Sequence, residues 1–199
     1  MKSLSCAALA LSLLLARASA GFAQEKMETT PYYPLAVGAT WEYKVGESKF
    51  TMKVTKHEKV GNVLCARLEM LKDNKPQSFE HVSVTKDGVC RNTFEDKEAM
   101  PPVLFFKLPP KKDQSWNVDS KAGGASIKGT FKDAGEEDVK VPAGSYKAVV
   151  VASQDLEANG VKMSITYYFA KDVGMVKQVV EIAGQKVIVE LEKYEAGKS

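Results

Sequence analysis

The feature that most constrains the fold is an alternation of apolar and polar residues at a spacing of two, found through most of the chain after position 40. Residues 41–45 and 163–169 show it most clearly, since every second side chain there is aromatic or aliphatic. Successive side chains of a β-strand point to opposite faces, so this spacing predicts strands with one buried face. Helical spacing is almost absent, and the chain is therefore predicted to be all-β.

Turn-forming residues separate the alternating segments at short intervals. The strongest turn signals are Pro142 and Gly144 in Pro142-Ala143-Gly144, Gly160 after Asn159, and Gly174 after Asp172-Val173. Proline fixes φ and glycine permits a positive φ, so these residues favour tight turns. The pattern gives about eleven strands with short connections, which forces successive strands to pair antiparallel as a long meander. We expect a strongly curved sheet or partly open barrel, with a two-layer β-sandwich as the alternative.

The middle of the chain is less regular. Residues 95–102 are charged and then limited by prolines, so no clear strand is expected there. Residues 127–131 and 139–141 are expected as two strands, with charged turn residues between them. The apolar run 103–106 is expected to be an edge strand packed on the core or a flap over a cavity.

The N-terminus predicts export. Lys2 is followed by an apolar run over residues 7–16, which is too short to span a bilayer, and then by small residues. We expect residues 1–23 to be a signal peptide cleaved after Ala23, with cleavage after Ala20 as the alternative, and residues 24–199 to be a single antiparallel β domain. Cys6 precedes the apolar run, so it does not match a lipidation site. The mature chain is expected in the periplasm or outside the cell, with no transmembrane segment.

The charge balance excludes nucleic acids as partners. The whole chain has 28 basic and 25 acidic residues and a net charge of +3. Removal of residues 1–23 would take away Lys2 and Arg17 and leave a nearly neutral protein. Lysine and glutamate are interspersed, so the basic footprint of a nucleic-acid-binding protein is not present in the sequence.

Two cysteines, Cys65 and Cys90, would remain after processing. An even pair in an oxidising compartment is typical of a disulfide, and closing this loop would stabilise the fold by roughly 3 kcal/mol. A pair of buried free thiols is the alternative, because a chain of this length can build a sufficient core without a bridge.

Catalytic and metal-binding patterns are weak. His57 and His81 are the two histidines, and they are too widely spaced for a typical zinc site. The sequence has no G-x-S-x-G nucleophile motif and no phosphate-binding glycine loop. We therefore predict a protein that is not an enzyme and needs no cofactor, with a carboxylate-based hydrolase as the alternative.

The aromatic residues supply the candidate binding site. Nine of them could line a cavity within a curved sheet or fill an ordinary core: Trp41, Tyr43, Phe50, Phe105, Phe106, Trp116, Tyr146, Tyr167 and Phe169. A filled core is the more common arrangement for such residues. If the sheet is hollow, the site would suit a hydrophobic small molecule or lipid.

Four segments in order along the chain resemble a group of exported bacterial proteins. They are 33–43, with Tyr33-Pro34-Leu35 and Trp41; 108–116, with Leu108-Pro109 and Trp116; 141–148; and 167–177. The chain resembles the TapB-like family, which implies a curved antiparallel sheet similar to the lipoprotein-carrier proteins of the bacterial envelope. Asp113 stands where that family usually has glycine, which puts the geometry of that turn in doubt. The family has no established catalytic residues to transfer.

These observations favour a non-enzymatic exported protein whose curved sheet binds a hydrophobic ligand or an envelope protein. The alternative from another class is a structural or assembly accessory of the envelope or of a surface appendage, as the TapB-like resemblance implies.

Overall fold

The computed structural model describes residues 27–198, all of whose regular structure is β. The expected signal peptide, residues 1–23, lies outside the described residues. Twelve strands follow one another: β1 Thr40–Val45, β2 Ser48–Val60, β3 Val63–Lys72, β4 Lys75–Thr85, β5 Gly88–Phe94, β6 Lys97–Lys107, β7 Ser115–Ala122, β8 Ala125–Val141, β9 Gly144–Ala158, β10 Val161–Ala170, β11 Gly174–Ile182 and β12 Gln185–Glu195.

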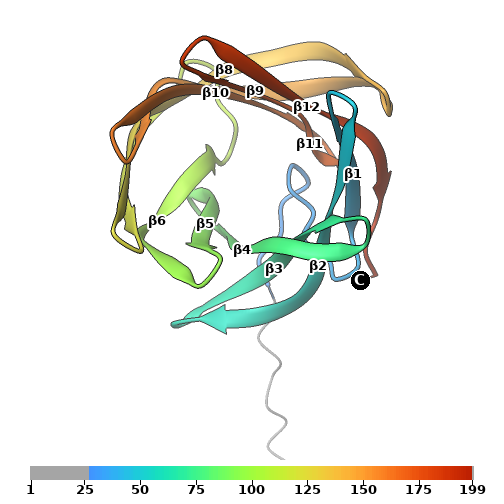
Figure 1. Cartoon of the computed structure of the whole chain (residues 1–199), viewed down its shortest axis with the longest axis horizontal. Helices are drawn as coiled ribbons and strands as arrows, with labels where there is room; N and C mark the ends of the chain where they lie inside the picture. Colours follow the sequence, from blue (N-terminus) through green and yellow to red (C-terminus); the bar gives the residue numbers. More distant parts are fainter. Residues whose placement is uncertain (1–26, 199) are drawn as a thin grey trace, which may run out of the picture.

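Each strand pairs antiparallel with the next, and β1 pairs with β12 to close a barrel (Figure 1). The predicted all-β meander is confirmed, and the sheet is a closed barrel, not a two-layer sandwich. Closure has a physical reason. Twist accumulates along a long meander, and joining the first strand to the last gives the backbone groups of both edges a partner.

The prediction of separate strands over 127–131 and 139–141 is wrong, because both lie in the 17-residue strand β8. Its pairing with β9 shifts register between Lys128 and Lys132 and again between Asp133 and Gly135. Such bulges bend a strand without ending it. The Asp133 carboxylate supports the second irregularity, because it accepts hydrogen bonds from the backbone N–H groups of Gly135 and Lys111, each at 2.8 Å.

The proline-limited segment 95–102 is also mostly strand, since β6 begins at Lys97 and passes through Pro101 and Pro102. Proline has no N–H to donate, so it is tolerated in a strand where few ladder bonds are needed. The β6–β7 ladder is short, with only Ala99 and Met100 of β6 in register with β7. The prolines therefore sit in the least paired wall of the barrel.

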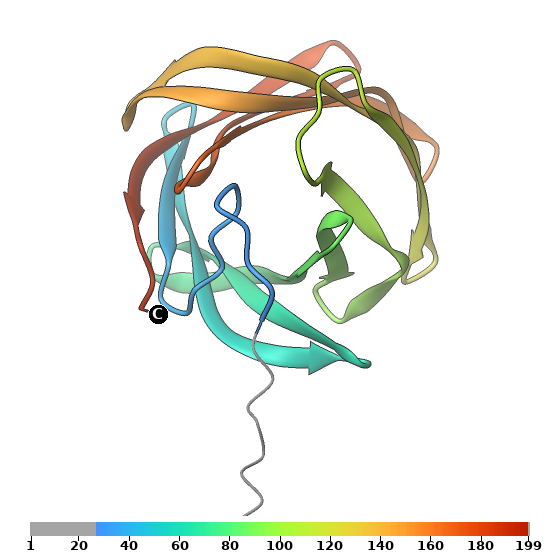
Figure 2. The same ribbon diagram turned by 180° about the vertical axis from the view of Figure 1, so that it is seen from behind.

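Residues 27–39, here called the N-terminal plug, precede β1 and enter the ring of strands (Figure 2). Leu35 and Ala39 are almost fully buried, and Tyr33 is 9% exposed. The backbone N–H of Asp172 donates to Pro31 O at 2.7 Å and ties the plug to the β10–β11 turn. The plug thus adds its own side chains to the barrel interior.

The residues expected in turns lie at hairpin connections. Pro142 and Ala143 join β8 to β9, and Gly144 begins β9 with φ of 137°. Gly160, with φ of 79°, joins β9 to β10 together with Asn159, and Gly174 begins β11 with φ of 95°.

Candidate functional site

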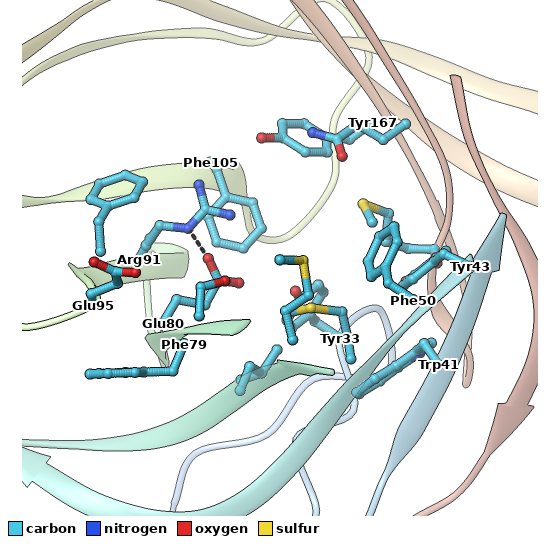
Figure 3. Close-up of a pocket in the computed structure, with 17 residues that line it drawn as sticks. Tyr33, Trp41, Tyr43, Phe50, Phe79, Glu80, Arg91, Glu95, Phe105 and Tyr167 are labelled. Carbon is cyan, nitrogen blue, oxygen red and sulfur yellow. Dashed lines mark hydrogen bonds and ion pairs between the residues drawn. The ribbon is translucent and has the colours of Figure 1, made fainter. Parts of the chain in front are cut away.

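A cavity of about 340 Å³ lies inside the barrel, between the N-terminal plug and the inner faces of the strands (Figure 3). Eight aromatic residues contribute to its wall: Tyr33, Trp41, Tyr43, Phe50, Phe79, Phe94, Phe105 and Tyr167. Aliphatic and thioether side chains complete the apolar part, from Met52, Leu68, Met70 and Met175. The polar part comes from Ser78, Glu80, Arg91, Glu95 and Gln178. The interior is therefore hollow and largely apolar.

Strand register places the apolar wall. Trp41 on β1 pairs with Met52 on β2, and Met52 pairs in turn with Met70 on β3. Residues directly opposite each other in a sheet share a face, so all three side chains point into the barrel. The two-residue alternation that predicts the strands also builds this side of the cavity.

The polar ends of two wall aromatics are already satisfied by backbone carbonyls. Trp41 Nε1–H donates to Val173 O at 2.6 Å, and the Tyr43 hydroxyl donates to Met175 O at 2.7 Å. Burial raises the pKa of Tyr43 far above its ordinary value, so its hydroxyl stays neutral. Both rings therefore contribute mainly apolar surface.

Tyr33 brings the plug into the wall. Its ring lies 5.6 Å from Phe105 and 6.3 Å from Trp41, measured between centroids. Burial raises the pKa of Tyr33, and the Glu80 carboxylate raises it further, so its hydroxyl remains a neutral hydrogen-bonding group. The plug is thus part of the site as well as part of the core.

An ion pair faces the cavity from the β4–β5 hairpin. Arg91 Nε lies 2.5 Å from Glu80 Oε2, as the dashed line in Figure 3 shows. The guanidinium carbon lies 5.1 Å from the ring centroid of Phe94 and 5.2 Å from that of Phe105. The guanidinium is therefore held by a carboxylate and by two aromatic rings.

The ion pair sets the charge state of this region. Burial by itself would lower the pKa of Arg91, but the Glu80 carboxylate, together with Tyr167 and Tyr33, more than offsets that effect, so the pKa of Arg91 is raised. Burial raises the pKa of the neighbouring Tyr167 as well. The cavity wall therefore carries one compensated pair of opposite charges beside neutral phenol groups.

Five of the nine aromatic residues proposed from the sequence line the cavity: Trp41, Tyr43, Phe50, Phe105 and Tyr167. The other four, Phe106, Trp116, Tyr146 and Phe169, pack elsewhere. Phe106 and Phe169 stack on each other with centroids 4.4 Å apart, and Trp116 stacks on Phe131. The Tyr146 hydroxyl donates to Ala143 O at 3.3 Å, beside the β8–β9 turn. The aromatic set thus divides between a hollow region and a filled core.

Glu80 and Arg91 were missed from the sequence, although the alternation contains a signal for both. Glu80 is in phase with the buried residues Val82 and Val84 on β4, and Arg91 is in phase with the buried Val89 on β5. Two opposite charges at core-facing positions of one hairpin are unusual, because buried charges need partners. That coincidence would have predicted an internal ion pair.

The disulfide expected between Cys65 and Cys90 does not form, because both residues are free thiols in the structure. Cys65 lies on β3 and Cys90 on β5, and β4 runs between them. Two strand spacings separate their Cα atoms by about 10 Å, which exceeds the reach of a disulfide. Burial raises the pKa of Cys65 to about 11, so this thiol stays protonated and poorly nucleophilic.

The two histidines make structural contacts. His81 Nε2 lies 2.9 Å from Glu58 Oε1 and its Nδ1 lies 2.8 Å from Thr93 Oγ1, while His57 Nε2 lies 2.6 Å from Leu35 O. Within residues 27–198, no group of three or more His, Cys, Asp or Glu side chains is placed to hold a metal ion. Nor does that part of the chain contain a helix long and apolar enough to cross a membrane.

Fold and site together define an antiparallel β-barrel with an aromatic-lined interior. No protein-family model matches the chain, and no curated protein matches it. A solved structure of a candidate lipoprotein from Parabacteroides distasonis is similar, with a TM-score of 0.51 and 10% identity over 85% of this chain and 100% of that one. A candidate exported protein with a YmcC-like fold from Bacteroides fragilis has a TM-score of 0.49 and 12% identity, over 82% of this chain and 98% of that one.

The likeness to the Parabacteroides distasonis protein shows a shared fold. Because the two chains are only 10% identical, it shows nothing beyond the fold. The resemblance to TapB-like proteins stays a prediction, because no family model matches.

Proposed function

We propose that this chain is an exported, non-catalytic β-barrel protein that binds one apolar or amphipathic small molecule in its interior. The observation that carries the proposal is the cavity of about 340 Å³ inside the closed barrel. Binding sites for small molecules are typically concave and largely apolar, and begin at about 300 Å³. A hollow of this size also leaves apolar surface without packing partners, which a bound molecule would supply.

The composition of the wall supports a lipid-like ligand. Three methionines line the cavity, Met52, Met70 and Met175. Methionine is flexible and polarizable, so it adapts its shape to a chain-like apolar ligand. The polar residues are few and lie together around Glu80 and Arg91, which favours a ligand with one polar end.

Export rests on two observations of different kinds. The N-terminal apolar run with small residues before Ala23 is typical of a signal peptide. The structurally similar protein of Parabacteroides distasonis is described as a candidate lipoprotein, which agrees with a place in the cell envelope. We infer a periplasmic or extracellular protein that carries or senses an envelope lipid.

The test is native mass spectrometry of the protein purified from its own host without detergent. The expected spectrum contains a complex with one bound molecule, which tandem fragmentation would release and weigh. The Met70→Trp variant is the matched control, because the larger indole would occupy the cavity and remove the complex. Bare protein in every preparation, together with no uptake of decanol by that protein, would defeat the proposal.

A further inference from the structure

We propose that the cavity selects amphiphiles with an uncharged head group able to donate and accept hydrogen bonds, such as an alcohol or a monoacylglycerol, over carboxylates and amines. This inference rests on the proposed function and names the ligand class of the same cavity. Its basis is the compensated Glu80–Arg91 pair in the cavity wall.

The charges that face the cavity cancel in its interior. Among the cavity-lining residues of the described chain, only Glu80, Arg91 and Glu95 have side chains that carry a full charge near neutral pH. Side-chain exposure is 16% for Glu80 and 20% for Arg91, whereas Glu95 is exposed to solvent beyond the end of β5. Water screens the charge of Glu95, so the interior of the site is close to neutral.

A charged head group would disturb this balance. A carboxylate placed beside Arg91 would also lie beside Glu80, and an ammonium group placed beside Glu80 would also lie beside Arg91. Either ligand would leave one charge uncompensated in a largely apolar cavity, which is costly. A neutral head group adds no charge and leaves the ion pair intact.

The groups around the ion pair suit a hydroxyl or ester. The Nη groups of Arg91 can donate, and the neutral phenol hydroxyls of Tyr33 and Tyr167 can both donate and accept. Tyr167 on β10 lies opposite Gln178 on β11, and the Gln178 amide adds one donor group and one acceptor. A head group that both donates and accepts hydrogen bonds can therefore find partners in this part of the wall.

The first experiment compares three ligands with the same chain, decanol, decanoate and decylamine, by isothermal titration calorimetry at about pH 8, where acid and amine are both charged. We expect decanol to bind at least about tenfold more tightly than either charged analogue, because an unpaired charge in the cavity is penalised. Decanoate or decylamine binding as tightly as decanol would overturn the inference.

The second experiment changes the charge of the wall. Glu80→Gln leaves Arg91 uncompensated and should shift the preference to decanoate, whereas Arg91→Gln should shift it to decylamine. The double variant E80Q/R91Q removes both charges and should restore the preference for decanol. Circular dichroism and thermal melting establish that each variant is folded before titration.

The outcomes separate the two proposals. Failure of all three ligands to bind the wild-type protein would contradict the proposed function itself. Binding of all three with the wild-type order unchanged in both E80Q and R91Q would contradict only the head-group selectivity. If a single variant does not fold, the wild-type series and the double variant still decide the question, because both lack an uncompensated charge.

Discussion

At the start of β5, the backbone of Gly88 passes very close to β6. A Cβ atom at this position would collide with the carbonyl oxygen of Phe106 and would lie 2.9 Å from Lys107 Cα. Its φ of 147° also disfavours any residue with a side chain. Gly88 is therefore required both for the turn and for the close approach of two strands.

We predict that Gly88→Ala lowers the free energy of unfolding by at least about 3 kcal/mol, because strain and collision add. Gly61→Ala is the control, since Gly61 also has a positive φ, of 56°, but no atom lies within 4 Å of the place that its Cβ would occupy. It should cost only about 1 kcal/mol. Urea unfolding measures both, and equal losses would show that the close contact between β5 and β6 is absent.

A second residue-scale prediction concerns acid stability. Glu58 is hydrogen-bonded to His81 and to Lys56, and these contacts lower the pKa of the Glu58 carboxyl. A lowered folded pKa favours the ionised form in the native state. The stabilisation is therefore present above the unfolded pKa of about 4.5 and is lost as pH falls through the lower folded value.

Glu58→Gln should thus lower the free energy of unfolding by roughly 1 kcal/mol near neutral pH, and the difference from wild type should vanish in strong acid. Urea unfolding over a pH series measures it. Asp119→Asn is the control, because Asp119 is 69% exposed and lies 3.7 Å from Lys128, so little change is expected. A Glu58→Gln loss that persists unchanged in strong acid would refute the assignment.

At this scale the sequence predicted the residues whose role follows from alternation. Trp41 and Tyr43 point inward for that reason. Tyr33 could not be placed in the cavity, because the plug has no periodicity to show which way its side chains point. The distance between Cys65 and Cys90 depends on how many strands lie between them in the sheet. The spacing of the two cysteines in the sequence does not give that number.

Among the strands, the weakest join is between β6 and β7, where the ladder pairs only Ala99 with Ala122 and Met100 with Lys121. Side chains bridge the rest of the join. Trp116 Nε1–H donates to Leu104 O at 2.8 Å, and the Ser120 hydroxyl donates to Pro101 O at 2.6 Å. The barrel wall is therefore held at this place by side chains more than by backbone.

Residues 115–120 are in register with β8 but not with β6. We predict that those of their amides that point toward β6 exchange with deuterium at least about tenfold faster than amides of residues 165–169, which are paired on both sides. Trp116→Phe should accelerate exchange in β6 and β7 by a further factor of roughly five, since one hydrogen bond is lost. Trp41→Phe should leave this region unchanged. Equal protection of β7 and β10 would mean that the β6–β7 join is as strong as the others.

Element boundaries were predictable where hairpins are regular and unpredictable where the ladder is irregular. The Asn159-Gly160 signal coincides with the two-residue connection between β9 and β10. The long strand β8 was divided in error, because a bulge changes the phase of alternation and looks like a strand end. Pairing with β9 keeps β8 continuous, and this is a tertiary effect that local sequence does not record.

The hollow interior is a property of the whole barrel. Alternation shows which side chains point inward, but the space they must fill depends on the number and tilt of the strands. Closure of twelve strands leaves more room than the inward side chains occupy, even with Tyr33 contributed by the plug. Alternation alone therefore does not decide between a cavity and a filled core; the closure of the barrel does.

Filling this space should remove ligand binding while preserving the fold. Met70 lies opposite Met52 in the cavity wall, and its replacement by tryptophan places an indole in empty space. We predict that Met70→Trp weakens decanol binding at least about tenfold and leaves the melting temperature equal or higher, since new contacts form without overpacking. A lower melting temperature with normal binding would indicate that Met70 does not face the cavity.

The most direct test of the central claim uses the two tryptophans, because Trp41 lines the cavity and Trp116 does not. Fluorescence is titrated with decanol in Trp116→Phe, which reports on Trp41 alone, and in Trp41→Phe, which reports on Trp116 alone. We predict a saturable change in the emission of Trp41 at one equivalent of ligand and none in that of Trp116. A constant signal from Trp41 at saturating decanol would contradict an interior binding site.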